Sequence, residues 1–140
     1  MKKLFFIAAL CLRSCQPLPA GIVSETIWHE ARGESLQGRY AVASVIWTRH
    51  IRSGRSLNAV CKRDKQFSCW NTAQSTPKPK NDAERALLVQ LEGWEFLMER
   101  GIFVPSGSWG HYLRVDCFPS WRKDLTNRRV IGNHLFGECK

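Results

Sequence analysis

Apolar residues recur at helical spacing in three segments of this 140-residue chain, and this pattern limits the fold more than any other feature. The segment 36–51 carries a broad apolar face, which suits a helix at the centre of a small domain. The segment 82–100 carries the clearest apolar stripe, and a shorter pattern covers 21–32. We therefore expect three helices, with 36–51 in the core.

Capping residues and glycines predict where these helices begin and end. Gly33 interrupts the first helix, and Ser35 is expected to cap the second. The third helix is expected to begin at Asn81 or Asp82 and to stop at Gly101. Each boundary rests on a local preference, so it can be read without knowing the tertiary structure.

The other segments show no sustained period. Segment 52–81 contains Gly, Ser, Asn and two Pro residues, which is typical of a loop with at most a short strand or helical turn. Segment 102–140 alternates Gly, Pro and aromatic residues, which indicates short strands and loops. The sequence thus predicts a mainly α (α+β) fold in one domain, with a loop-rich, weakly β C-terminal third.

The first twenty residues have the features of an export signal. Lys2 and Lys3 precede a short apolar run, and cleavage is expected after Ala20. The domain is then 21–140, exported to the periplasm, the cell wall or the exterior. Two alternatives rank lower: a lipoprotein anchored at Cys15, and retention of the signal as an uncleaved anchor. No stable membrane insertion is expected after processing.

The charge of the chain indicates an anionic partner. Removal of Lys2, Lys3 and Arg13 from the 21 basic residues leaves 18 against 12 acidic ones, a net charge of +6. Nucleic acid, acidic lipid and bacterial cell wall are all anionic, but export and the lack of basic runs interleaved with aromatics argue against nucleic acid. We expect a monomer that acts on the cell wall.

The cysteines outside the signal predict disulfides, because an exported chain with an even number of cysteines commonly forms them. They are Cys61, Cys69, Cys117 and Cys139. Among the three connectivities, Cys61–Cys69 with Cys117–Cys139 closes the shortest loops and is preferred. No pair has C-x-x-C spacing, so neither a structural zinc site nor another cofactor is expected.

Four sequence blocks occur in the order found in a known family. They are "EARGES" from Glu30, "GRYAVASVIWTR" from Gly38, "QFS" from Gln66, and a final group of "HY", "PSW" and "IGNHLFG". Together they span 27–137 and resemble the SleB/CwlJ group of bacterial cell wall hydrolases, the spore cortex-lytic type. The resemblance implies a lysozyme-like fold, cleavage of peptidoglycan between N-acetylmuramic acid and N-acetylglucosamine, and Glu30 as the catalytic acid.

Glu30 also suits acid catalysis on chemical grounds. Cleavage of a glycosidic bond requires a proton donor in partly dry surroundings, and Glu30 lies at the margin of an apolar stripe beside Ile27 and Trp28. Taken alone, it would more often be a surface carboxylate paired with arginine. Glu34 is the candidate second carboxylate for hydrolysis, or else a structural group tying down Arg32 or a backbone N–H. Lytic transglycosylation needs no second carboxylate, because the sugar's own 6-hydroxyl attacks.

Further residues are predicted to bind the sugar through stacking rings and polar groups, with a structural role in the core as the alternative for each. These substrate-binding candidates are Gln66, Phe67, Ser68, Trp70, Trp109, His111, Tyr112 and His134, with Trp121 as another stacking ring.

Two rival functions are weighed. A zinc amidase would draw its ligands from His29, Glu30, His111 and His134, but the chain lacks H-E-x-x-H. A wall-binding module would use its Trp residues and positive charge without catalysis. The owner is either a bacterium remodelling its own wall or a phage that uses the protein as an endolysin.

Overall fold

The computed structural model describes residues 21–63, 66–71 and 77–139, and the predicted export signal at 1–20 lies outside them. The elements in chain order are α2 (Ile22–Ala31), α3 (Leu36–Ser53), α4 (Leu57–Cys61), the 3-10 turn η1 (Ser68–Trp70), α5 (Asp82–Glu99), β1 (His111–Arg114), the 3-10 turn η2 (Ser120–Asp124), β2 (Leu125–Ile131) and β3 (His134–Cys139). The predicted helices and the weakly β C-terminal part are therefore present.

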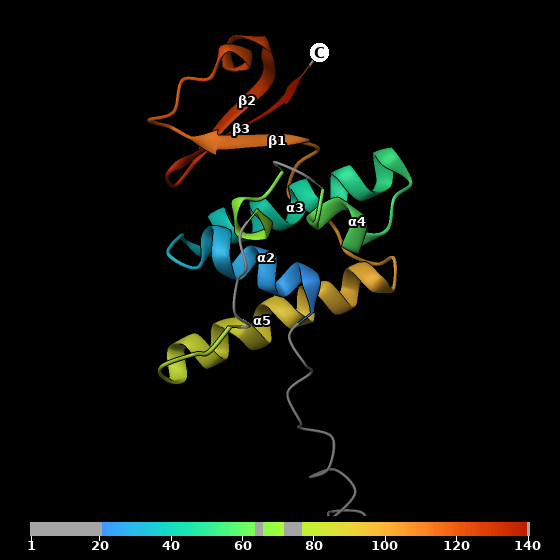
Figure 1. Ribbon diagram of the computed structural model, residues 1–140, viewed down its shortest axis with the longest axis vertical. Helices are drawn as coiled ribbons and strands as arrows, with labels where there is room; N and C mark the ends of the chain where they lie inside the picture. Colours follow the sequence, from blue (N-terminus) through green and yellow to red (C-terminus); the bar gives the residue numbers. More distant parts are fainter. Residues whose placement is uncertain (1–20, 64–65, 72–76, 140) are drawn as a thin grey trace, which may run out of the picture.

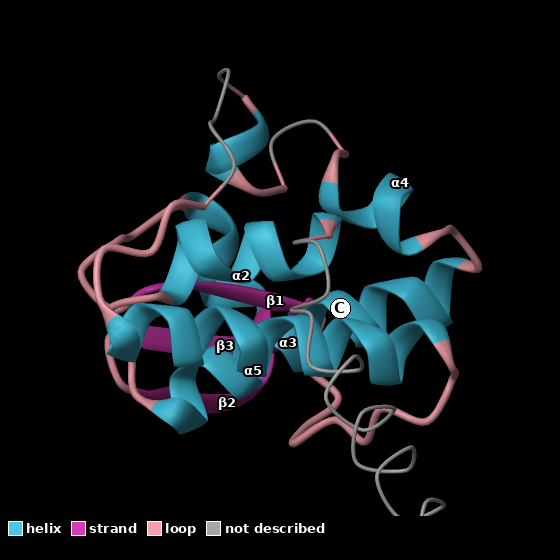
Figure 2. Cartoon of the chain, turned by 90° about the horizontal axis from the view of Figure 1, so that it is seen from below, coloured by secondary structure: helices cyan, strands magenta, loops and turns pink. Residues whose placement is uncertain are grey.

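The helices form a stack beneath a small sheet. The sheet lies at one end of the molecule, α3 packs against β1 and β2, and α2 packs against α3, α4 and α5 (Figure 1). Seen from below, the helices lie across the sheet (Figure 2). None of the helices in the described ranges is both long and apolar enough to cross a bilayer.

Helix α3 forms the centre of the core, as its apolar face predicts. Its residues 41–48 are all buried, between α2 on one side and the sheet on the other. The Ser35 hydroxyl caps the helix by accepting a hydrogen bond from the Gly38 N–H at 3.2 Å. Gly54 ends the helix in the left-handed conformation with φ 65°.

A buried carboxylate on α5 holds the start of α2. Glu95, 7% exposed, accepts hydrogen bonds from the Val23 N–H at 3.1 Å, the Ser24 N–H at 2.9 Å and the Ser24 hydroxyl at 2.8 Å. These N–H groups have no partner within their own helix, and a helix N-terminus favours negative charge. A Cβ at Gly21 would overlap the Glu95 carboxylate, so glycine provides the room. Glu95 thereby sets the position of the helix that carries Glu30.

The three strands form an antiparallel sheet in the order β1-β3-β2. Tyr112 pairs with Phe136 and Arg114 with His134, so β1 lies along residues 134–137 of β3. The β2–β3 turn contains Gly132 with φ 58°. This register brings Tyr112 and His134, from different strands, next to each other above α2.

The prediction of two disulfides is not met, because the four cysteines among the described residues are free. Cys117 follows the end of β1, near the start of β3, whereas Cys139 ends β3, five residues or about 17 Å further along the strand. A disulfide allows only about 7 Å between its Cα atoms. Cys61 and Cys69 are both buried as free thiols, and burial raises the pKa of each thiol to about 12. Short loop length was therefore a poor guide to pairing.

Candidate active site

Glu30, in the last turn of α2, is the point where three distant segments of the chain meet. Its Oε1 accepts hydrogen bonds from the Ser68 hydroxyl at 3.0 Å and the Cys69 N–H at 3.4 Å. Its Oε2 accepts one from the Tyr112 hydroxyl at 3.1 Å. The residue is half-buried, so the carboxyl group is held firmly at the surface of the domain.

Tyr112 is built into the interface between the sheet and the helices. Its ring stacks on Phe136 at 5.7 Å between centroids and meets the edge of His134 at 5.2 Å. Burial, together with the Glu30 carboxylate, raises the pKa of Tyr112 well above its ordinary value. The phenol therefore stays protonated and remains a hydrogen-bond donor toward Glu30.

The turn η1 is anchored on both sides of Ser68. Phe67 is 1% exposed and packs in the core, under the Arg49 guanidinium at 5.2 Å from its ring centroid. The Trp70 indole N–H donates to the Thr26 hydroxyl at 2.8 Å. These contacts fix the backbone that presents Ser68 and Cys69 to Glu30.

The prediction that the Phe67 and Trp109 rings bind sugar is corrected by the structure, because both rings are buried in the apolar core. Phe67 offers no surface to a ligand, as its exposure shows. Trp109 is 4% exposed, packs on Phe136 and donates its indole N–H to the Asn127 carbonyl at 3.1 Å. Trp70 is half-buried, and Trp121 is 37% exposed and lies 6.0 Å from the His111 ring. Of the predicted stacking rings, these last two keep accessible surface.

Glu34 is tied to the β2–β3 turn. Its Oε2 accepts from the Asn133 N–H at 3.3 Å, and its Oε1 accepts from the Asn133 side-chain amide at 3.2 Å. The His134 ring lies 3.5 Å from Oε1. A Cβ at Gly132 would overlap the same carboxylate. Glu34 thus joins the α2–α3 turn to the sheet, and these contacts fix the position of the β2–β3 turn relative to the helices.

His134 and His111 lie on opposite sides of Tyr112. Burial lowers the pKa of each below its ordinary value, so both rings are predominantly neutral at neutral pH. His134 is buried beside Glu34, whereas His111 is half-buried and lines a cavity together with Gln66. Of the two, His111 has the position from which a ligand can be reached.

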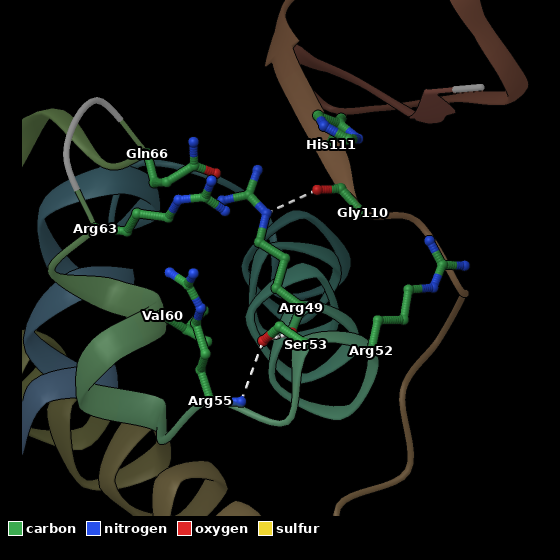
Figure 3. A pocket seen from close by; sticks show the side chains of 9 residues that line it. All are labelled: Arg49, Arg52, Ser53, Arg55, Val60, Arg63, Gln66, Gly110 and His111. Atoms are coloured by element: carbon green, nitrogen blue, oxygen red, sulfur yellow. Dashed lines mark hydrogen bonds between the residues drawn. The ribbon is translucent and has the colours of Figure 1, made fainter.

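Arginines around that cavity are the site feature that the sequence analysis missed. Arg49, Arg52 and Arg55 follow one another at intervals of three residues along and just past the end of α3, and Arg63 faces them (Figure 3). This spacing along "TRHIRSGR" was the available signal.

Candidate metal ligands do not gather. Within 21–63, 66–71 and 77–139, no three side chains of His, Cys, Asp or Glu lie close enough to hold a metal ion. The donor set that the amidase alternative would require is therefore not assembled by these residues.

The family follows from comparison with known proteins. The family described as Cell Wall Hydrolase matches residues 33–137, and the chain belongs to this family. The match begins three residues after Glu30, so the candidate acid lies just outside the matched range.

Known relatives are spore cortex-lytic enzymes. That of Oceanobacillus iheyensis is 28% identical over 123 residues, which cover 85% of this chain and 40% of the relative. That of Bacillus subtilis is 27% identical over 121 residues, which cover 84% of this chain and 36% of the relative. The chain thus spans about two fifths of the length of the curated relatives it matches.

Solved structures share the fold. The catalytic domain of the Bacillus cereus SleB protein matches with a TM-score of 0.57 at 26% identity, over 85% of this chain and 87% of that one. The catalytic domain of the germination-specific lytic transglycosylase SleB from Bacillus anthracis matches with a TM-score of 0.60 at 22% identity, over 85% and 91%. The predicted lysozyme-like α+β fold is confirmed by these matches.

Proposed function

We propose that this chain cleaves the glycan strands of peptidoglycan between N-acetylmuramic acid and N-acetylglucosamine, with Glu30 as the acid and then the base. The observation that carries the proposal is the Glu30 carboxyl group, held by Ser68, Cys69 and Tyr112 in a member of the cell wall hydrolase family. The relatives' names, which describe cortex-lytic enzymes, support the same class of substrate.

The contacts of Glu30 suit both protonation states that the reaction requires. The hydroxyls of Ser68 and Tyr112 donate to the carboxylate, and each can turn to accept from the carboxylic acid. Glu30 would give its proton to the glycosidic oxygen as the bond to the leaving sugar breaks. The resulting carboxylate is then stabilised by the same hydroxyls and by the Cys69 N–H.

Lytic transglycosylation is the outcome that the geometry favours. Hydrolysis uses a second carboxylate to act on water or on the sugar, but both oxygens of Glu34 accept hydrogen bonds from Asn133. In transglycosylation, Glu30 takes the proton of the muramic acid 6-hydroxyl as that oxygen bonds to C1. The product is a 1,6-anhydromuramic end, and no water is consumed.

Mass spectrometry of purified sacculi digested by the protein tests the proposal. We expect glycan fragments with 1,6-anhydromuramic ends, and their loss by a factor of roughly a hundred or more in Glu30→Gln. Glu99→Gln, an exposed carboxylate at the end of α5, is the matched control and should retain activity. Reducing muramic ends would indicate hydrolysis, and free stem peptides would overturn the proposal in favour of an amidase.

We also propose that the protein acts outside the cytoplasm as a monomer, after removal of residues 1–20. N-terminal sequencing of the protein recovered from the medium or periplasm tests this. A mature chain that begins at Gly21 is expected, whereas an acylated Cys15 would support the lipoprotein alternative. Light scattering of the purified protein reports the oligomeric state.

A further inference from the structure

A cavity of about 250 Å³ with a strongly basic lining lies at the C-terminal end of α3. Four of its nine lining residues are arginines, from the end of α3, the following turn and the segment after α4 (Figure 3).

The positive charge in this cavity is only partly balanced by the described residues. Arg52 is paired with Glu138 at 2.9 Å. Arg49 donates from Nε to the Gly110 carbonyl at 2.7 Å, but its Nη1 is buried without a hydrogen-bond partner among the residues described. A buried N–H without a partner is costly, and guanidinium groups brought together repel one another. An anion in the cavity would relieve both.

The polar groups at the ends of the lining side chains are arranged to bind a carboxylate. The guanidinium groups of Arg49 and Arg63 and the Gln66 amide point toward one another in Figure 3. Planar guanidinium groups bind carboxylate and phosphate through paired hydrogen bonds. The cavity is smaller than the roughly 300–1,000 Å³ that holds a whole drug-sized ligand, so it fits a part of a larger substrate.

The walls of the cavity continue directly into the residues around Glu30. His111 precedes Tyr112 in β1, and Gln66 lies two positions before Ser68. Both Tyr112 and Ser68 donate to Glu30. The Arg49 guanidinium also interacts electrostatically with the Glu30 carboxylate. A glycan strand bound with its glycosidic oxygen at Glu30 would therefore extend toward the arginines, because the same two segments hold Glu30 and line the cavity.

We infer that this arginine cavity binds a free carboxylate of the peptide stem attached to the muramic acid next to the cleaved bond. The inference rests on the proposed function and deepens it, because it makes the enzyme selective for strands that carry acidic peptides. A stem carboxylate is favoured over a free or polymeric phosphate because it is covalently joined to the sugar that Glu30 acts on.

Calorimetric titration of the Glu30→Gln protein tests the inference without turnover. The ligands are N-acetylmuramoyl-L-alanyl-D-glutamate as the free acid and the same compound with both carboxyl groups amidated. We expect the acid to bind about tenfold more tightly than the amide. That ratio should fall to near one when Arg55→Ala and Arg63→Ala are added, since both exposed side chains line the cavity.

A matched control separates the cavity from the overall charge. The double variant Arg85→Ala and Arg100→Ala also removes two positive charges, but from α5 and its C-cap, outside the cavity lining. This variant should preserve the ratio of acid to amide binding. Circular dichroism of each variant verifies that it is folded.

Two results would overturn the inference. One is equal binding of acid and amide by the Glu30→Gln protein. The other is displacement of the acid by an equal concentration of inorganic phosphate, which would indicate a phosphate-bearing polymer as the natural occupant. The proposed function is tested separately, by digestion of sacculi with the unmodified protein. Its failure can therefore be distinguished from failure of this inference.

Discussion

The hydroxyl of Tyr112 donates a hydrogen bond of 3.1 Å to Glu30 Oε2 and joins β1 to α2 across 82 positions of the chain. Ser68, from a third segment, donates to the other carboxyl oxygen. The candidate acid is therefore positioned by groups that come together only when the sheet and η1 dock on the helices. Its geometry depends on the whole domain.

Tyr112→Phe is expected to reduce activity as well as stability, because the hydroxyl is hydrogen-bonded to Glu30 in the folded protein. The variant keeps the ring that packs on Phe136 but removes the hydroxyl that orients Glu30. Loss of one hydrogen bond to a charged group, about 1.5–3 kcal/mol, corresponds to a fall in kcat/KM of roughly ten- to a hundredfold. Initial rates on labelled sacculi, with thermal unfolding of the same samples, measure both effects.

Tyr40→Phe is the matched control for that experiment. It also removes a tyrosine hydroxyl, one that donates to the Val104 carbonyl away from Glu30. We expect it to keep normal rates. Full activity of Tyr112→Phe would show that the hydroxyl has no part in positioning Glu30.

Glu34→Gln is expected to weaken the fold more than the reaction. The carboxylate accepts two hydrogen bonds from Asn133, so the free energy of unfolding should fall by about 1–3 kcal/mol. The rate per folded molecule should stay within about threefold of the unmodified protein, because Glu34 contacts Asn133 and His134, whereas Ser68, Cys69 and Tyr112 position Glu30. Denaturant unfolding and initial rates measure the two quantities. A hundredfold loss of rate at unchanged stability would instead assign Glu34 a direct catalytic role.

Glu95→Gln is expected to destabilise the protein by about 2–3 kcal/mol. The amide nitrogen of Gln would face donors at the start of α2, where the carboxylate now accepts three hydrogen bonds. The midpoint of urea unfolding should fall, with Glu99→Gln on the same helix as a control that leaves it unchanged. An unchanged midpoint for Glu95→Gln would refute the role assigned to this carboxylate.

Glu92 predicts a pH dependence of stability. Burial, and then the neighbouring Glu95, raise the pKa of Glu92 above its ordinary value of 4.5. Because the folded-state pKa lies above the unfolded one, protonated Glu92 favours folding, and its contribution is present below the unfolded pKa and lost as the pH rises through the folded one. The unfolding temperature of Glu92→Gln, measured relative to that of the unmodified protein at the same pH, should thus be higher at about pH 7 than at about pH 4. An equal difference at both pH values would contradict the prediction.

Local features were sufficient to predict the three longer helices α2, α3 and α5, but they did not place the five-residue α4. The cap at Ser35 and the choice of Asn81 or Asp82 agree with the structure, in which Ser35 accepts from Gly38 and Asn81 accepts from Glu84 at 2.9 Å. Caps, glycines and apolar periodicity act over a few residues, so the chain determines them without tertiary contacts. The order of the family blocks likewise predicts Glu30 as the catalytic acid, and this signal also lies in the sequence itself.

Tertiary structure alone decided the surroundings of that carboxyl group. Burial took Phe67 and Trp109 into the core, and Asn133 occupied Glu34. The register of β1 on β3 placed Tyr112 above α2, while the distance along β3 kept Cys117 from Cys139. These outcomes depend on how distant segments pack, because contacts between residues far apart in the chain are set by packing and register and leave no local trace in the sequence.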